Sequence, residues 1–440
     1  MKINIQFGVD LKVDFKVMLI KPKLPIELSP MSTSTVFTAI TLPNGQEIKN
    51  RIVKASMEEN MSDGFLEPSE ELINLNRTWA EGGTGLLLTG NVMIDRLAMT
   101  GPGGVVLDKD SKLEKFIKLS SAAKSNGARA WMQINHPGRQ VYKRMGGKVY
   151  SPSDVSLDMG KLSDMFGDAK TMTEPEIYDV IQRFVDTAAQ AEKAGFEGVE
   201  IHAAHGYLIA QFLSPLVNRR EDQWGGSLEN RSRLLVEVVK GVNKATSDGF
   251  GVGVKLNSAD FQRGGFDIDD ALAVVKLLEP LEIDLVELSG GSYEAPAMQG
   301  VTADGRTLKR EAYFLEFAEK IADQTNIPVM TTGGIRRLSV AEKVLANNVS
   351  MVGIATGLAT APNLPNIWQT KPDFEAPYPS INWKNQTFRS LAVMSYVKYQ
   401  LRRTGAKLPV NMNASPLLIF IKDQIRTSKL TKRYKRIIGA

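Results

Sequence analysis

Short apolar runs alternate with longer amphipathic stretches along most of this chain. A run of about four to eight apolar or β-branched residues predicts a buried strand, whereas apolar positions three and four residues apart predict a helix. Eight strands are predicted in this way, at residues 51–55, 85–89, 129–134, 198–201, 251–256, 284–288, 328–331 and 351–354. Eight alternations of strand and helix favour an α/β fold of the (β/α)8 TIM-barrel type over an open sheet.

One of the predicted helices has a well-marked start. Thr173, Glu174, Pro175 and Glu176 form the pattern of a capping box with proline in the first turn. Apolar residues then recur with helical period, at Ile177, Val180, Ile181, Phe184, Ala188 and Ala191. The sequence therefore predicts a helix between the third and fourth strands.

The connection after the third strand is unusually long, from about residue 135 to residue 172, and it contains several glycines. Long connections in a compact barrel are usually functional, and those that follow a strand lie over the face that carries the active site. We therefore predict that this connection is a lid.

Both ends of the chain depart from the barrel pattern. Residues 1–30 precede a second methionine, Met31, and are predicted to be an extension that is loosely ordered or lies ahead of the native start. The barrel is assigned to residues 31–370. Residues 371–440 are assigned to a helical, basic extension that follows a proline-rich connector.

Two helices are predicted in this extension, at residues 388–403 and from Ser415 onward. Apolar residues gather near one face of the first helix, at Leu391, Met394, Val397 and Leu401. The second helix has Leu417, Ile421 and Ile425 on one face. We expect the apolar faces of these helices to pack against the barrel exterior or a partner subunit. A homo-oligomer is therefore possible.

The composition narrows the class of protein. Cysteine is absent, which excludes disulfides, thiolate nucleophiles and cysteine-bound zinc or iron–sulfur clusters. No apolar run reaches the length of about 18 residues that suggests a transmembrane helix. The N-terminus shows no signal-peptide pattern. These features predict no membrane span and a cytoplasmic location.

Positive charge is concentrated at the C-terminal end. The chain has a net charge of +5, and residues 401–440 carry ten Lys and Arg against one acidic residue, Asp423. A basic tail of this kind can bind nucleic acid or anionic lipid, but it is more often a solvated surface. We favour the solvated surface and expect no nucleic-acid partner.

Chemistry is concentrated directly after the fourth strand. His202, His205 and Tyr207 lie within six positions, and the chain has only 3 histidines. Two imidazoles can donate to one carbonyl oxygen and make the carbonyl electron-poor, and a phenol can donate a proton to a neighbouring carbon. A histidine at a strand end can also be purely structural. A zinc site would need a third protein ligand, and nothing ties the remaining histidine to this pair, so no metal is expected.

The following residues decide between these interpretations. The segment LSPLVNRREDQWGGSLENRSR, residues 213–233, closely resembles the Old Yellow Enzyme family of FMN-dependent ene-reductases, and the resemblance extends over residues 36–365. It implies a TIM-barrel flavoprotein in which FMN lies across the carboxyl ends of the strands. It also implies that NADH or NADPH binds transiently over the flavin.

The resemblance assigns cofactor contacts to successive strand ends. Gln133 is implied to contact the pyrimidine part of the flavin, Lys255 its N1/C2 carbonyl region, and the residues after the seventh and eighth strands its phosphate. The implied FMN-binding residues are Ala55, Ser56, Met57, Gly90, Gln133, Lys255, Gly333, Gly334, Ala355 and Thr356. His136 and Arg139 are implied to lie at the mouth of the site, as substrate or lid contacts.

Two positions depart from the family pattern. Many members have Gly-Arg where this chain has Ala355-Thr356, and Arg336 or Arg337 could replace the lost guanidinium at the phosphate. Glu58 stands where relatives often have threonine or cysteine near the flavin C4 carbonyl. A carboxylate there disfavours an electron-rich ring, so we expect a lower flavin potential.

The predicted function is an NAD(P)H:flavin oxidoreductase of ene-reductase type, which reduces the C=C bond of small α,β-unsaturated carbonyl compounds by ping-pong hydride transfer. In this prediction His202 and His205 hold the carbonyl oxygen and Tyr207 protonates the α-carbon. An NADH oxidase, a dehydrogenase or a nitro-compound reductase on the same flavin is the nearest alternative. A flavin-free TIM-barrel lyase or isomerase is a more distant one.

Overall fold

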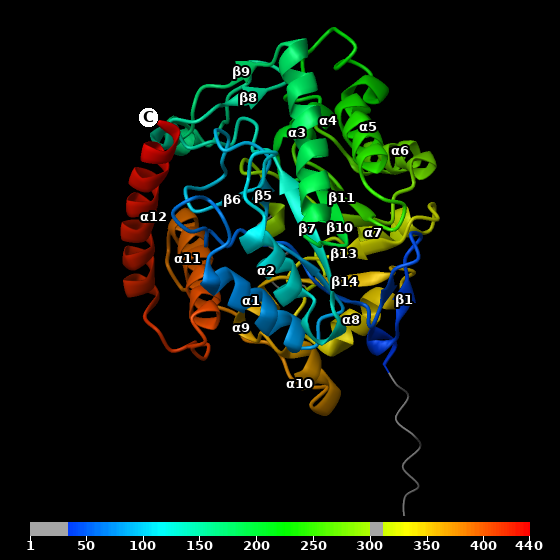
Figure 1. The fold of residues 1–440 in the computed structure, drawn as a ribbon, viewed down its shortest axis with the longest axis vertical. Helices are drawn as coiled ribbons and strands as arrows, with labels where there is room; N and C mark the ends of the chain where they lie inside the picture. The colour runs from blue at the N-terminus through cyan, green and yellow to red at the C-terminus, as the bar shows by residue number, and fades with distance from the viewer. Residues whose placement is uncertain (1–33, 300–310) are drawn as a thin grey trace, which may run out of the picture. The chain divides into compact units, whose positions relative to one another are not determined.

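Eight parallel strands close into a ring at the centre of the protein (Figure 1). The computed structural model describes residues 34–299 and 311–440, so the predicted extension at residues 1–30 lies outside the described residues. The ring closes because β10 pairs with β11 on one side and with β7 on the other. Its strands are β3 (Ile52–Lys54), β4 (Leu86–Leu88), β7 (Arg129–Asn135), β10 (Gly198–Ala203), β11 (Gly251–Asn257), β12 (Leu285–Ser289), β13 (Val329–Thr331) and β14 (Met351–Ile354). The predicted (β/α)8 barrel and all eight predicted strands are confirmed.

Helices surround the ring and bury their apolar faces against it. They are α1 (Glu70–Glu81), α2 (Glu114–Ala123), α3 (Glu174–Lys193), α5 (Leu228–Ala245), α6 (Ile268–Leu278), α7 (Leu315–Ala322) and α8 (Leu338–Leu345). The predicted start of α3 is confirmed, because Thr173 and Glu176 form a capping box and the backbone N–H of Thr173 donates to the Glu176 carboxylate at 2.8 Å. Such a box satisfies N–H groups that a helix start leaves free.

Short elements lie in the segment before β3 and in the connections around the barrel. The 3-10 helices are η1 (Thr35–Phe37), η2 (Ser125–Gly127), η3 (Lys143–Met145), η4 (Gly160–Met165), η5 (Glu279–Leu281) and η6 (Ala297–Gln299). The remaining strands and helices are β1 (Ile40–Thr41), β2 (Glu47–Ile48), β5 (Val92–Met93), β6 (Val105–Val106), β8 (Tyr150–Ser151), β9 (Lys170–Thr171), α4 (Leu208–Leu213), α9 (Thr356–Thr360) and α10 (Leu364–Thr370). The long connection after β7 contains η3, η4 and the small parallel sheet β8–β9.

Two long helices follow the barrel and lie side by side at one flank, α11 (Gln386–Gly405) in orange and α12 (Pro416–Ile438) in red (Figure 1). Both predicted helices are present, and Ser415 caps the second. They belong to the same compact unit as the barrel, which spans Ser34–Ala440. The predicted boundaries at residues 30 and 370 stay predictions.

The orientation of α12 differs from the prediction. Leu417, Ile421 and Ile425 are 56%, 45% and 53% exposed, so this stripe does not pack against the barrel. The helix instead buries Asp423 and Tyr434 with three neighbours on that face. Asp423 accepts hydrogen bonds from α11, and Tyr434 donates to the Arg96 carbonyl at 2.8 Å. Polar partners therefore select the buried face, which apolar periodicity alone cannot reveal.

On α11, only the last of the four predicted apolar residues, Leu401, is fully buried. Across residues 34–299 and 311–440, none of the helices combines the length and apolar character needed to cross a membrane.

Candidate active site

The carboxyl end of β10 brings the two predicted catalytic histidines together. His202 is the fifth residue of the strand, and His205 lies in the turn that follows the strand. The Nε2 atom of His202 lies 3.2 Å from the Nδ1 atom of His205, and the two rings meet edge to face. An oxygen atom placed beside these two nitrogens is within reach of both.

An unusual backbone conformation at His205 brings the two imidazole rings into contact. His205 has a φ of +60°, in the left-handed region that residues other than glycine rarely adopt. Its backbone N–H donates to the Asn257 side-chain oxygen at 3.0 Å, which holds the turn in place. Backbone strain of this kind is typical of functional sites, where the surrounding structure enforces it.

Two side chains that sequence reasoning missed orient these rings. The Nδ1 atom of His202 lies 3.2 Å from Asn135 Oδ1, and the Nε2 atom of His205 lies 2.7 Å from Ser289 Oγ. Burial, followed by the charges of its neighbours, lowers the pKa of each histidine well below its ordinary value. Both imidazoles are therefore neutral at physiological pH. The position of both residues at a strand end was the available signal.

Tyr207 completes the predicted set. Its ring centroid lies 4.9 Å from that of His202, and its hydroxyl lies 3.1 Å from the hydroxyl of Tyr293, in the connection after β12. Burial and the Glu58 carboxylate raise the pKa of Tyr207, and burial also raises that of Tyr293. Both phenols therefore keep their protons. Sequence reasoning missed Tyr293, because no motif connects it with the histidines.

Aromatic residues of the long connection after β7 extend this wall. The Phe166 ring lies 6.0 Å from that of Tyr293, and it stacks on Tyr142 at 4.9 Å. The predicted lid thus reaches the tyrosine pair, and it does so through flat apolar faces. A planar molecule could bind against such a wall.

Charged and polar side chains form the floor of the barrel beside the histidines. The Ser56 hydroxyl donates to Gln133 Oε1 at 2.8 Å, and Gln133 Nε2 donates to Glu200 at 2.6 Å. Lys255 donates to Glu287 at 2.6 Å. A glutamine side chain has two N–H groups and two acceptor lone pairs, so Gln133 keeps one of each for a further partner.

The ends of β13 and β14 supply backbone donors. Gly333 and Gly334 have φ values of +121° and +71°, which favour glycine. Neither N–H makes a backbone hydrogen bond within residues 34–299 and 311–440. The next strand end leads through Ala355 into α9, whose first residue is Thr356. N–H groups left free at loops and helix starts suit a phosphate. The donors present therefore fit the anionic end of FMN.

The arginines predicted to replace the missing phosphate ligand are otherwise engaged. Arg337 pairs with the buried Glu311 carboxylate at 2.9 Å, and Arg336 pairs with Glu375 at 2.6 Å and with Glu311 at 3.5 Å. Neither guanidinium group is left unpaired, so the structure speaks against this substitution. The acidic partners lie 25 or more positions away in sequence, so no local pattern predicted these pairs.

The segment after β3 carries four predicted residues. Ala55 is buried and continues the strand pairing, since its N–H donates to the Ile354 carbonyl at 3.0 Å. Met57 packs against the main core. Glu58 forms an ion pair with Lys398 of α11 at 2.8 Å. The sequence suggested an uncompensated carboxylate at this place, and the structure shows a partner for it.

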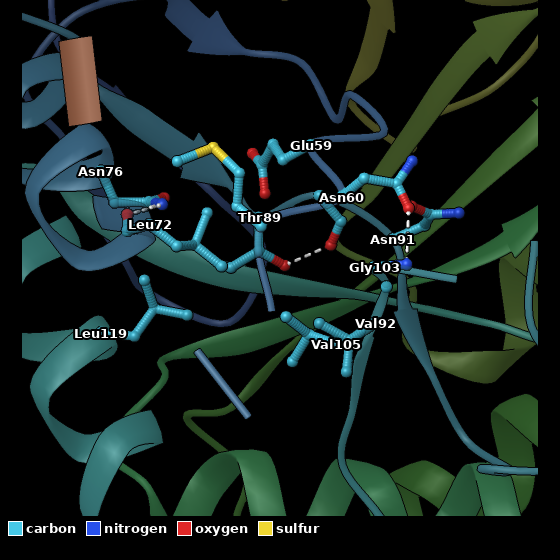
Figure 2. Close-up of a pocket in the computed structure, with 13 residues that line it drawn as sticks. Glu59, Asn60, Leu72, Asn76, Thr89, Asn91, Val92, Gly103, Val105 and Leu119 are labelled. Atoms are coloured by element: carbon cyan, nitrogen blue, oxygen red, sulfur yellow. Dashed lines mark hydrogen bonds between the residues drawn. The ribbon is translucent and has the colours of Figure 1, made fainter. Parts of the chain in front are cut away.

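Gly90 lies where the predicted site borders a small separate cavity. A Cβ atom on Gly90 would come within 2.5 Å of both the Glu59 carboxylate and the Met57 carbonyl, so packing inside the protein already requires glycine. Figure 2 shows the cavity, which is lined by residues of α1 and α2, by the segment after β3, and by residues around the end of β4 and the starts of β5 and β6. None of the predicted catalytic residues lines it. Contact between Gly90 and FMN stays a prediction.

His136 and Arg139 both lie near the start of the lid connection, directly after β7. His136 lies near parallel to the Tyr150 ring, at 6.1 Å, and burial lowers the pKa of His136 to about 4. Arg139 donates to two lid carbonyls at residues 155 and 156, and it pairs with Glu294 at 2.7 Å. The first two sets of contacts hold the lid connection together, and the Glu294 pair ties it to the connection after β12. Within the part of the chain that the structure describes, no group of three His, Asp or Glu residues is placed to hold a metal ion.

Comparisons with known proteins agree with this architecture. The NADH:flavin oxidoreductase / NADH oxidase family matches residues 35–371. The NADH-dependent flavin oxidoreductase nadA of Aspergillus parasiticus is 36% identical over 342 residues, which cover 75% of this chain and 73% of that protein.

Two solved structures are similar along most of the chain. A 2-naphthoyl-CoA reductase in complex with 2-naphthoyl-CoA has a TM-score of 0.75 and 26% identity, over 85% of this chain and 58% of that one. The Old Yellow Enzyme homologue of Zymomonas mobilis has a TM-score of 0.66 and 21% identity, over 81% of this chain and 98% of that one. The chain therefore belongs to the NADH:flavin oxidoreductase / NADH oxidase family, which includes the Old Yellow Enzymes, and it is an oxidoreductase with FMN as cofactor and NADH or NADPH as reductant.

Proposed function

We propose that this enzyme reduces the C=C bond of α,β-unsaturated carbonyl compounds. The observation that carries the proposal is the convergence of His202, His205 and Tyr207 at one strand end, with two neutral imidazoles beside a protonated phenol. When bound, FMN supplies hydride to the substrate β-carbon after its own reduction by NADH or NADPH. The side chains of this chain do the remaining work.

The two histidines hold the carbonyl oxygen. An enolate oxygen gains negative charge as the double bond is reduced, and donors already in place stabilise that charge. Both donors must carry their protons on the facing nitrogens, His202 Nε2 and His205 Nδ1. Asn135 can set the position of the proton on the His202 ring. In the orientation observed, Asn135 Oδ1 lies opposite His202 Nδ1, and Asn135 Nδ2 is buried without a partner among the described residues. Rotation of the Asn135 amide would present N–H to Nδ1 and leave the proton on Nε2.

Tyr207 then donates its proton to the α-carbon. A phenol whose pKa is raised holds its proton until a strongly basic carbon forms beside it, which suits a general acid. Tyr293, at 3.1 Å, can pass a proton to Tyr207 or stabilise the phenolate left behind. Phe166 and Tyr142 place aromatic rings next to this tyrosine pair.

FMN is held, in this proposal, by the floor and by the β13–β14 end of the barrel. Gln133 and Ser56 present hydrogen-bonding groups, Lys255 adds a positive charge, and Gly333, Gly334 and Thr356 present N–H groups to the phosphate. The predicted contacts of Ala55, Met57, Gly90 and Ala355 remain part of the same proposal. The family assignment removes the alternative of a flavin-free barrel.

A two-step anaerobic experiment tests this function. The purified protein, loaded with FMN, is first reduced with NADH or with NADPH and then mixed with cyclohexenone, while the flavin absorbance is followed. Reoxidation by the enone, with cyclohexanone as product, is expected. If oxygen and a nitroaromatic reoxidise the flavin rapidly while the enone does not, the proposal is wrong and the NADH oxidase or nitro-compound reductase alternative takes its place.

Apart from this proposal, the substrate is identified only as a small molecule. A cytoplasmic location and a homo-oligomeric state remain predictions from the sequence. So does the solvated role of the basic tail, although several of its basic side chains form contacts inside the protein, including Arg402 with Asp423.

A further inference from the structure

The C-terminal helix α11 contributes a charged side chain to the mouth of the barrel. Lys398 pairs with Glu58 at 2.8 Å, although the two residues are 340 positions apart. Their side chains are only 18% and 23% exposed. Ion pairs at exposed surfaces contribute little to stability. Charges shielded from water to this extent interact more strongly with neighbouring groups.

This pair belongs to a wider contact between the two C-terminal helices and the segment after β3. Arg426 of α12 donates to the Asn60 carbonyl at 2.9 Å. Arg433, two turns further on, donates to the Ser62 carbonyl and hydroxyl at 3.2 and 3.1 Å. Three basic side chains of α11 and α12 thus hold residues 58–62, the segment that leaves the first barrel strand. The Lys398 contact is therefore part of a fixed interface.

Both members of the pair are charged. Burial tends to raise the pKa of Glu58, but Lys398 and the hydrogen bonds from Lys398, Asn60 and Thr100 outweigh burial and lower it. Burial tends to lower the pKa of Lys398, but Glu58 outweighs it and raises that pKa, with help from Asp423.

The charge of Glu58 also acts on three phenols of the site. Burial is the main cause that raises the pKa of Tyr207, Tyr293 and Tyr142, and the Glu58 carboxylate raises each of these pKa values further. Tyr207 and Tyr293 touch through their hydroxyls beside His202, and Phe166 connects Tyr293 with Tyr142. A carboxylate that affects all three also affects a ring placed among them.

We propose that Lys398 is a positioning residue of the flavin site, which keeps the Glu58 carboxylate in place and compensates its charge, so that the C-terminal helices set the reduction potential of the bound FMN. The inference rests on the proposed placement of FMN at the mouth of the barrel. Reduced flavin is the more electron-rich form. A lone carboxylate nearby disfavours this form and lowers the potential, whereas a lone ammonium group favours it and raises the potential.

The experiment is a double-mutant cycle on the FMN-loaded protein. Midpoint potentials are measured by spectroelectrochemical titration for the wild type, Lys398→Met, Glu58→Gln and the double variant. We expect a lower potential for Lys398→Met, a higher one for Glu58→Gln, and a return toward the wild-type value in the double variant. Each single change should alter the ratio of the affinities for oxidised and reduced FMN at least tenfold, which for a two-electron couple is about 30 mV.

The pH dependence separates a charge effect from a loss of structure. Without Lys398, burial raises the pKa of Glu58, so the carboxylate becomes neutral as the pH falls. The potential of Lys398→Met should therefore return toward the wild-type value at lower pH and fall again as the pH rises. Lys398→Arg keeps the charge and should behave as the wild type. It also provides a second variant if methionine at this position impairs folding.

Arg403→Met is the matched control. It removes a basic side chain of the same helix that donates to the Pro409 carbonyl at 2.7 Å and contacts neither member of the pair. Its potential should equal that of the wild type. FMN uptake with unchanged potentials in both single variants would overturn this inference alone. A wild-type protein that takes up no FMN would overturn the proposed placement of the cofactor and this inference with it.

Discussion

His202 and His205 face each other through Nε2 and Nδ1, at 3.2 Å, and each ring is held from behind by a separate polar side chain. Asn135 contacts the far nitrogen of His202, and Ser289 contacts that of His205. With no ligand, the two facing nitrogens can share only one proton between them. A carbonyl oxygen that accepts from both rings would replace this shared bond with two, so the site is arranged for an acceptor.

The first prediction concerns this pair. His202→Ala should slow the oxidation of reduced enzyme by cyclohexenone on the order of 100- to 1000-fold, because one donor to the developing enolate is lost. Stopped-flow measurement of flavin reoxidation checks this. Ferricyanide accepts electrons without needing a carbonyl-binding site, and its rate should stay the same. An unchanged enone rate would contradict the assignment of His202.

The second prediction separates proton donation from oxygen binding. Tyr207→Phe should slow enone turnover by a factor on the order of 100 to 10,000, the usual contribution of a general acid. Reduction of a nitroaromatic requires no protonation at carbon and should be nearly unaffected. Tyr293→Phe, which keeps the aromatic contact but removes the hydroxyl at 3.1 Å, should have the same effect in a weaker form. Equal losses with both oxidants would show that Tyr207 acts through structure.

The third prediction concerns stability in acid. The folded protein depresses the pKa of His136 to about 4, whereas an unfolded histidine titrates near 6.5. The unfolded state therefore binds more protons between these values, and stability falls as the pH falls through this window, by up to about 1.4 kcal/mol per pH unit for one histidine. His202 and His205, whose pKa values are also lowered, act in the same direction.

Chemical denaturation at a series of pH values measures this slope. His136→Gln removes one of the three groups, so its stability should depend less steeply on pH between about 6.5 and 4. Glu200 opposes the effect, because burial and Glu287 raise its pKa and so favour the folded state at lower pH. A His136→Gln slope as steep as that of the wild type would contradict the depressed pKa.

The fourth prediction concerns the lid. Glu294 pairs with the buried Arg139 at 2.7 Å and accepts a second hydrogen bond from the Asp158 backbone at 2.8 Å. Glu294→Gln leaves Arg139 buried without its counter-charge, which costs roughly 3–5 kcal/mol. The lid should open more often, so limited proteolysis between residues 154 and 168 should accelerate and KM for the enone should rise.

A matched control lies on the same lid. Lys143 and Asp168 are 3.9 Å apart, and their side chains are 64% and 92% exposed. Such a pair contributes little to stability, so Lys143→Gln should leave both the cleavage rate and KM unchanged. Equal proteolysis of Glu294→Gln and the wild type would show that the Arg139 pair does not hold the lid.

The strand pattern was predictable because it is local. A buried parallel strand is apolar on both faces, so the strands β10 and β11 can be recognised from their own residues. The start of α3 was equally predictable, since Thr173 and Glu176 form hydrogen bonds with each other within one turn. The proximity of His202, His205 and Tyr207 also followed from sequence, because five positions after a strand cannot take them far apart.

Contacts between distant segments were not predictable in this way. Tyr293 meets Tyr207 across 86 positions, and Arg139 meets Glu294 across 155. Each side chain alone is compatible with a solvated loop. The expectation that the apolar stripe of α12 packs against the barrel was wrong for the same reason, because Asp423 is buried by polar partners on another helix. Packing against a partner subunit stays a prediction.

The sequence by itself thus determined the barrel, the order of its strands and the strand ends at which the chemistry gathers, since each depends on burial within a few consecutive residues. Only the tertiary structure decided which charges meet: Lys398 reaches Glu58, and Glu311 takes both arginines that had been candidates for the phosphate. The reason is physical. An ion pair depends on the distance between two side chains in space, and that distance is set by how whole helices and loops pack.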